Sequence, residues 1–335
     1  MAAPPAGIYK MGPITESDTV IEVQVTPICT VKHLVVGDAT EILTDESFVP
    51  DIRELLPLVK EMPVYEDDVF LIGHAKAGTH WTWEIVSMLM KGTTEYEKMS
   101  KARRQLEFHY PDEFVDMPRP RVFNTHYLLH HIPRQAIEKR CKIIVIQRNP
   151  KDVAVSLYYH IKGTPYLHKD TTFDEFVSSW LSHDMNTTAN WFYYTKKLQE
   201  TLYEQKEVAV HNIFYEDLQE DPVREVRKLV EYLDIERNDE FIKAVVDKCG
   251  FQNLKKADEN KVSAIEGLPK EAFSHLYRKG EVGDWKNHLT VARNEQFDKI
   301  YNERMKDVKF NFSNFSGIST IKSTRKGARV PGKNQ

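Results

Sequence analysis

The sequence has few cysteines and no long apolar run. Its 335 residues contain three cysteines, Cys29, Cys141 and Cys249, which are far apart and show no zinc-type pairing. Isolated cysteines in odd number are typical of a reducing compartment. No stretch approaches the ~18 to 20 apolar residues of a membrane span. The first seven residues, MAAPPAG, also lack the basic start and apolar core of a signal peptide. We therefore expect a soluble, cytoplasmic protein.

An excess of charge of one sign is also missing. The formal net charge is −4, so a general nucleic-acid-binding surface is not expected, and any anion site must be built locally. The length permits one large domain or two smaller ones, and we favour one. Residues 1–18 are expected to be a loose N-terminal segment, residues 19–310 a single domain, and residues 311–335, which are basic and contain no acid, a disordered tail.

Apolar runs alternate with amphipathic segments along the chain, which predicts the fold class. We expect helices from 81 onward and near 133–139, 150–160, 174–181, 190–205, 222–233, 240–249 and 290–305. Strands are expected at 20–25, 69–72, 121–126, 141–148 and 207–214. Residues 108–114 are expected to be flexible. The alternation predicts an α/β fold with a central parallel sheet flanked by helices, in which 141–148, apolar on both faces, is a central strand.

A glycine-containing loop lies between the strand at 69–72 and the helix after it. Such a strand, loop and helix N-terminus form a cradle for anions, because free backbone N–H groups converge there. The usual nucleotide-triphosphate loop, G-x-x-x-x-G-K-[ST], has its lysine after the second glycine. Here Thr79 follows Gly78, and Lys76 lies between Gly73 and Gly78. The ammonium is therefore directed at a different atom of the ligand.

Further cations follow in two places. Kinases and nucleotidases of the phosphate-loop type need an aspartate near the end of a strand to hold Mg²⁺, whereas the strand at 141–148 ends in Arg148, a fork suited to binding phosphate directly. Ser156, two helical turns further on, lies where it can donate to the same anion. Arg278 and Lys279 precede Gly280, which lets the backbone approach an anion and makes a second phosphate site plausible. A metal-dependent reaction is therefore disfavoured.

His126 ends the predicted strand at 121–126. An imidazole titrates near neutral pH and can act as a general base. It would stand beside the glycine loop if the strands at 69–72 and 121–126 are neighbours.

Five motifs, taken in their order along the chain, resemble those of the cytosolic sulfotransferases, over roughly residues 45–308. They are Gly73 to Trp81, Asn124-Thr-His126, Gln147 to Ser156, Phe214-Tyr-Glu-Asp217, and Arg278 to Lys286. The resemblance implies the sulfotransferase variant of the P-loop-like fold. It also implies metal-free, in-line transfer of a sulfuryl group from 3′-phosphoadenosine 5′-phosphosulfate (PAPS) to a hydroxyl or amine of a small, mostly apolar acceptor.

The resemblance also implies residue roles. His126 would be the general base, with Lys76 and Ser156 as the other catalytic residues. The residues implied to bind the 5′-phosphosulfate are Lys76, Ala77, Gly78, Thr79 and His80. Those implied for the 3′-phosphate are Arg148, Ser156, Arg278, Lys279 and Gly280, and those for the adenine are Trp81, Tyr215 and Phe251. A homodimer would form through Lys286 to Glu295.

Departures from the family pattern leave alternatives open. Ala77 and His80 replace hydroxyl residues of the loop, and Asn124 stands where the family's Lys-Thr-His motif has a lysine. Asn124 brings no charge, so a nucleotide-binding protein with weak or lost catalysis is the alternative; a kinase or nucleotidase fits less well. The acceptor is not identified by the sequence. Residues 28–60, 104–118 and 158–170 are expected to line an apolar pocket for it.

Overall fold

The computed structural model describes residues 19–26, 29–36, 39–42, 52–98, 101–162, 169–182, 190–204, 208–263 and 277–308, and residues 19–42 by their strands alone. The expected loose segment before residue 19 and the expected basic tail after residue 310 lie outside the described residues.

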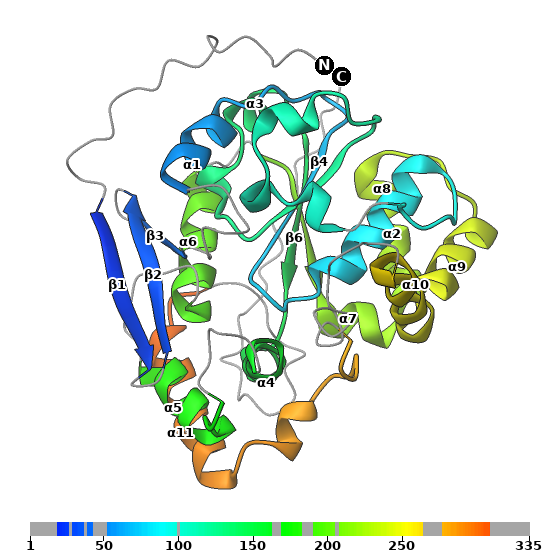
Figure 1. Cartoon of the computed structure of the whole chain (residues 1–335). Coiled ribbons are helices and arrows are strands. Elements are labelled where there is room, and N and C mark those ends of the chain that lie inside the picture. Colours follow the sequence, from blue (N-terminus) through cyan, green and yellow to red (C-terminus); the bar gives the residue numbers. More distant parts are fainter. Residues whose placement is uncertain are drawn as a thin grey trace, which may run out of the picture.

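Four parallel strands form the central sheet, in the order β5-β4-β6-β7 (Figure 1). They are β4 (Val69–Gly73), β5 (Val122–Thr125), β6 (Lys142–Gln147) and β7 (Val210–Phe214). Leu71 of β4 pairs with Asn124 on one side and Ile144 on the other. The predicted parallel sheet is confirmed. The strand before the glycine loop pairs with the strand before His126, which is the condition for His126 to lie beside the loop. Their carboxyl ends meet at one edge, which faces α4 in Figure 1.

Both faces of this sheet are buried, since a hydrophobic core lies on each side. Successive side chains of a strand point to opposite sides and so enter different cores. Phe70 and Ile72 pack in one core, and Val69 and Leu71 pack in the other. The first core includes side chains of α1 (Ile52–Lys60), α3 (Arg134–Glu138) and α6 (Trp191–Glu204). The second includes side chains of α2 (Thr79–Lys91), α8 (Pro222–Leu233) and α9 (Asp239–Lys248), on the other side of the sheet in Figure 1.

A third core lies beyond the carboxyl edge of the sheet. It joins α4 (Pro150–Ile161), α5 (Phe173–Ser182), the start of α6 and α11 (Val291–Arg304). Asn149 caps α4 by accepting from the backbone N–H of Lys151, as its position before Pro150 predicts. Near this core lies a separate antiparallel sheet of β1 (Thr19–Thr26), β2 (Cys29–Val36) and β3 (Ala39–Ile42). The sequence predicted β1 but not the other two strands.

The prediction of a flexible segment at 108–114 is wrong. Short 3₁₀ turns cover this region: η1 (Lys101–Arg104), η2 (Leu106–Phe108) and η3 (Pro111–Phe114). Leu106 and Phe114 are fully buried, and the ring of Phe114 packs edge-on against Phe123 of β5, with 5.2 Å between centroids. Short turns have no hydrophobic periodicity, so their burial gives no signal in the sequence. The turns η4 (Leu129–His131) and η6 (Asp284–Asn287) and the helices α7 (Tyr215–Glu220) and α10 (Phe251–Ser263) complete the described elements.

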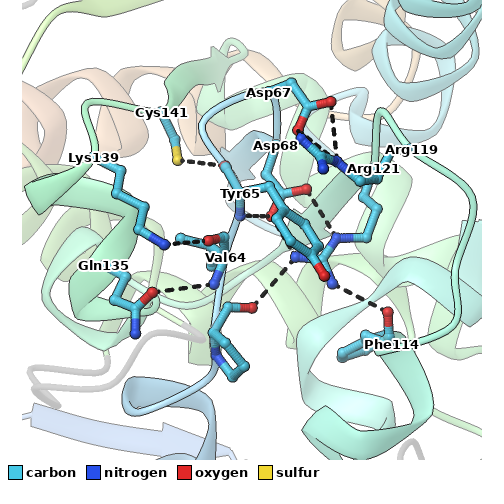
Figure 2. Close-up of polar contacts among 11 residues, drawn as sticks. Val64, Tyr65, Asp67, Asp68, Phe114, Arg119, Arg121, Gln135, Lys139 and Cys141 are labelled. Carbon is cyan, nitrogen blue, oxygen red and sulfur yellow. Dashed lines mark hydrogen bonds and ion pairs between the residues drawn. The ribbon is translucent and has the colours of Figure 1, made fainter.

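A buried ion pair holds the start of β5 (Figure 2). The guanidinium of Arg121 donates to both carboxylate oxygens of Asp68, at 2.8 and 2.5 Å, and also to the carbonyls of Phe114 and Pro63. The side chains of Arg121 and Asp68 are 2% and 0% exposed. Every member of a buried charge pair needs such partners, because an unpaired charge in the interior is very costly.

None of the described helices is long and apolar enough to cross a membrane.

Candidate active site at the carboxyl edge of the sheet

A cavity of about 650 Å³ lies where β4, β5 and β6 end. All the predicted site residues except Ala77 line it, namely Lys76, Gly78, Thr79, His80, Trp81, His126, Arg148, Ser156, Tyr215, Phe251, Arg278, Lys279 and Gly280. The side chain of Ala77 is buried in the core, and its N–H donates to the carbonyl of His74 within the loop. Phe108 and His160, from two of the segments predicted to form the acceptor pocket, also line the cavity.

The loop after β4 has the conformation that its glycines permit. Lys76 and Gly78 both have positive φ, 67° and 109°. A side chain at Gly78 would place a Cβ 2.7 Å from the ring of Tyr215, so only glycine fits here. No side chain caps the N-terminus of α2, which begins at Thr79. Its first N–H groups therefore remain available for an anion.

Arg148, directly after β6, contacts the loop that carries Lys76. Arg148 donates to the carbonyls of Lys76 and Glu281, at 3.1 and 3.3 Å, and lies over the ring of Tyr215. Its Nε–H is buried without a hydrogen-bond partner among the described residues. Burial, and then the charges of Arg148 and Lys101, lower the pKa of Lys76 to about 7. An anionic ligand could accept a hydrogen bond from Nε–H of Arg148, and its charge would favour the protonated form of Lys76.

A second cationic group lies at 278–284. Arg278 and Lys279 both pair with the buried carboxylate of Asp284. Burial alone would raise the pKa of Asp284, but hydrogen bonds from Lys279, Asn287 and Arg278 hold it well below its usual range. Gly280 has φ 71°, and a Cβ there would lie 2.2 Å from the ring of Phe251. The backbone at Gly280 therefore packs directly on an aromatic wall of the cavity.

His126 is held in one tautomer. Its Nδ1 lies 2.7 Å from the carbonyl oxygen of Gly73. A carbonyl oxygen only accepts, so Nδ1 carries the ring proton and Nε2 is the acceptor. Burial, and next the charge of Lys101, lower the pKa of His126 to about 3, so the imidazole is neutral.

Two residues that the sequence analysis missed support this edge. Lys101 of η1 lines the cavity and donates from Nζ to Asn124 and Thr79. Glu107 of η2 accepts hydrogen bonds from the Thr125 hydroxyl and from the backbone N–H of His126, and so fixes the end of β5. Burial raises the pKa of Glu107. Nothing in the charged stretch 98–120 distinguished these two residues from solvated ones.

An aromatic region forms the remaining side of the cavity. The ring of Trp81 meets Tyr215 with 5.6 Å between centroids, and Phe251 meets Tyr277 at 5.7 Å. The imidazole of His80 lies on this side, with Nε2 2.8 Å from the Asp258 carboxylate. Flat apolar walls with a few polar groups suit a purine base.

One group of side chains within the described residues could hold a metal ion. His80, Glu84 and Asp258 place one ligand atom each within 4.8 Å of one another. The same Asp258 accepts a hydrogen bond from Tyr277 at 2.6 Å. The expectation of a metal-free protein therefore stays a prediction.

These features define the class of the protein. Two separated cationic groups, a helix N-terminus without a side-chain cap and an aromatic wall surround one cavity at the carboxyl edge of a parallel sheet. That edge is where open α/β sheets bind their ligands. The lining of this cavity suits a nucleotide that carries anionic groups at two places, on an α/β fold.

Comparison with known proteins identifies the family. The model of the sulfotransferase domain matches residues 66–309. Sulfotransferase 1A1 of Rattus norvegicus is 32% identical over 275 residues, which cover 77% of this chain and 91% of the relative. Human sulfotransferase 1E1 is 33% identical over 257 residues, covering 73% and 86%. The chain belongs to the sulfotransferase family, as its motifs predicted.

Solved structures agree. Mouse sulfotransferase SULT7A1, complexed with the desulfated nucleotide PAP, superposes with a TM-score of 0.62 at 26% identity, covering 81% of this chain and 94% of that one. Retinol dehydratase in complex with androsterone and PAP superposes with a TM-score of 0.65 at 17% identity, covering 88% and 94%, which supports the fold. Family membership makes the chain a sulfotransferase, and the two superpositions support its fold.

Proposed function

We propose that the cavity binds PAPS and that His126 is the base for sulfuryl transfer to a hydroxyl or amine of a small, mostly apolar acceptor. The observation that carries this proposal is the convergence of Lys76, Arg148, Arg278 and His126 on one cavity. Phe108, from the segment expected to receive the acceptor, supports an apolar acceptor.

The proposed binding roles follow the chemistry of the lining. Lys76 and the backbone N–H groups at the start of α2 bind the 5′-phosphosulfate, with Gly78 letting the chain approach. The 3′-phosphate is bound by Arg148, whose Nε–H has no other described partner, and by Ser156, Arg278, Lys279 and the backbone of Gly280. Trp81, Tyr215 and Phe251 enclose the adenine.

The proposed transfer uses two side chains directly. PAPS supplies the sulfuryl group, with its P–O–S bridge as the bond that breaks. Nε2 of His126 takes the proton from the acceptor oxygen or nitrogen as that atom bonds to sulfur. The ammonium of Lys76 stabilises the charge that develops on the leaving phosphate oxygen. A base with a pKa near 3 is weak, but the negative charge of the bound nucleotide will raise the pKa of His126.

Label transfer tests this proposal. Purified protein with ³⁵S-labelled PAPS should label members of a panel of phenols, alcohols and amines. His126→Ala should lower kcat by about 10²-fold to 10⁴-fold and should still bind PAP, measured by calorimetry. His211→Ala is the matched control, because His211 of β7 is another histidine whose pKa is lowered by burial but does not line the cavity. Equal losses in the two variants would contradict the assignment of the base.

The alternative is a nucleotide-binding protein with weak or lost catalysis, which Asn124 favours because it brings no charge where the family has lysine. Micromolar or tighter PAP binding without turnover on the whole panel would establish it.

The finer expectations remain proposals of the same kind. We expect transfer to persist after EDTA treatment, and we expect the protein to be cytoplasmic.

We also expect a homodimer through Lys286 to Glu295, where the side chain of Val291 is 76% exposed. Such a short segment makes a small interface. Light scattering after size exclusion at micromolar protein should show a dimer, and monomer alone would contradict it.

A further inference from the structure

We propose that Lys101 binds the transferring sulfonate and supplies the cation that strand β5 lacks at Asn124. This inference rests on the proposed function and adds a catalytic residue to it. It assigns a purpose to a lysine that comes from a 3₁₀ turn rather than from a strand end.

The geometry places the ammonium of Lys101 between the two strand ends. Its Nζ donates to Oδ1 of Asn124 at 2.8 Å and to the hydroxyl of Thr79 at 3.2 Å. Thr79 is the first residue of α2, and Asn124 is paired with Leu71 in the sheet. Lys101 therefore stands at the proposed phosphosulfate end of the cavity, which it lines together with Lys76 and His126.

The protein does not neutralise this charge by direct contact. Lys101 makes no ion pair among the described residues, and its two hydrogen-bond acceptors are neutral oxygens. An ammonium has three N–H donors and no acceptor, so one donor remains for a ligand. Burial lowers the pKa of Lys101 to about 8, although the charge of Glu107 opposes the shift. A partly desolvated cation of this kind gains most from a bound anion.

Asn124 serves as the positioning residue for Lys101. Besides accepting from Nζ, its amide Nδ2 donates to the backbone carbonyl of Lys101 at 3.1 Å. The fully buried Asn124 side chain thus holds both ends of the lysine. A lysine at this position could not accept a hydrogen bond and would place a like charge against Lys101. Asparagine here is therefore consistent with a charge that has moved to η1 instead of being lost.

Electrostatic coupling supports the same location. The charge of Lys101 contributes to lowering the pKa of both Lys76 and His126. The three groups therefore act on one region of the cavity, where an incoming sulfonate would meet two ammonium groups and a neutral imidazole. Arg148 is the other cation that lowers the pKa of Lys76.

Kinetics with matched variants test the role of Lys101. Lys101→Met should lower kcat by about 10²-fold, the usual effect of removing one stabilising donor, while PAP, which lacks the sulfonate, binds with an affinity within about threefold of the wild type. Lys101→Arg keeps the charge and should retain more activity than Lys101→Met. Lys98→Met is the control, because Lys98 is an exposed lysine of the same stretch.

Moving the charge back to the strand completes the test. Adding Asn124→Lys to Lys101→Met should raise kcat at least about tenfold over Lys101→Met alone, because a donor of about the same strength returns to the edge. The inference is overturned if Lys101→Met turns over within threefold of wild type, if PAP affinity falls as much as kcat, or if the double variant shows no recovery. Absence of transfer by the wild type would instead contradict the proposed function itself.

Discussion

Two adjacent arginines allow a sharp test of what holds β5, the strand that delivers Asn124 and His126, in place. Arg121 pairs with Asp68 in the interior, and Arg119 pairs with Asp67 at the surface (Figure 2). Both arginines use Nε and Nη2, which reach the two carboxylate oxygens of Asp68 but meet mainly at Oδ1 of Asp67. Both guanidinium groups lie over the ring of Tyr65, that of Arg119 at 4.1 Å and that of Arg121 at 4.6 Å from its centroid. The two pairs therefore share their chemistry and differ in burial.

Replacing each arginine by methionine should give very different losses of stability. Arg121→Met leaves the carboxylate of Asp68 buried, with the N–H of Tyr65 as a remaining donor at 2.8 Å, and removes the donors to the carbonyls of Phe114 and Pro63. Breaking a buried pair by removing one partner costs about 3–5 kcal/mol. Arg119→Met should cost a small fraction of that, because the side chains of Arg119 and Asp67 are 50% and 40% exposed and their attraction is screened by water.

Urea unfolding measures both losses. The midpoint should fall for Arg121→Met at an unchanged slope of the unfolding free energy against urea, and it should hardly move for Arg119→Met. Equal shifts for the two variants, or a shift below about 1 kcal/mol for Arg121→Met, would refute the claim that burial decides the value of this pair.

Two further predictions concern the nucleotide site. Gly280→Ala should weaken PAP binding at least tenfold more than Gly283→Ala, because both positions have positive φ but a Cβ meets the ring of Phe251 only at Gly280; calorimetry that gives equal losses would exclude the collision. The association constant for PAP should fall as pH rises above about 7, with proton uptake on binding, because Lys76, whose pKa is about 7 without a ligand, is charged when the 5′-phosphate is bound. A flat titration from pH 7 to 9 would contradict this.

Local signals account for the parts of the fold that the sequence predicted. The buried strands β4 and β6 are short apolar runs, and the N-cap of α4 at Asn149 is a local contact with Lys151. The glycine loop needs no distant partner to be recognised. For these reasons the strands that precede Lys76, Arg148 and His126 could be predicted from the sequence, and in the structure the three residues line one cavity at the carboxyl edge of the sheet.

Elements without a periodic apolar face were missed for a physical reason. Helix α10 contributes Leu254 to the core but is otherwise largely polar, so its pattern resembles that of a solvated segment. The turns η1 to η3 are ordered by contacts with distant residues, such as the ring of Phe114 on Phe123 and the carboxylate of Glu107 on Thr125. Contacts of this kind depend on the finished sheet.

Asn124, which stands where the family motif has lysine, shows that a sequence motif and a cavity give different information about charge in the site. A motif compares residues at one position of the chain, so Asn124 reads as a loss of charge. A cavity, in contrast, is lined by charged side chains from distant parts of the chain. Lys101 of η1 reaches Asn124 although the two residues are 23 positions apart in the sequence. Electrostatic stabilisation depends on the position of the charge and not on the element that carries it. Whether a departure from a family motif removes a function is therefore decided by what the neighbouring turns supply.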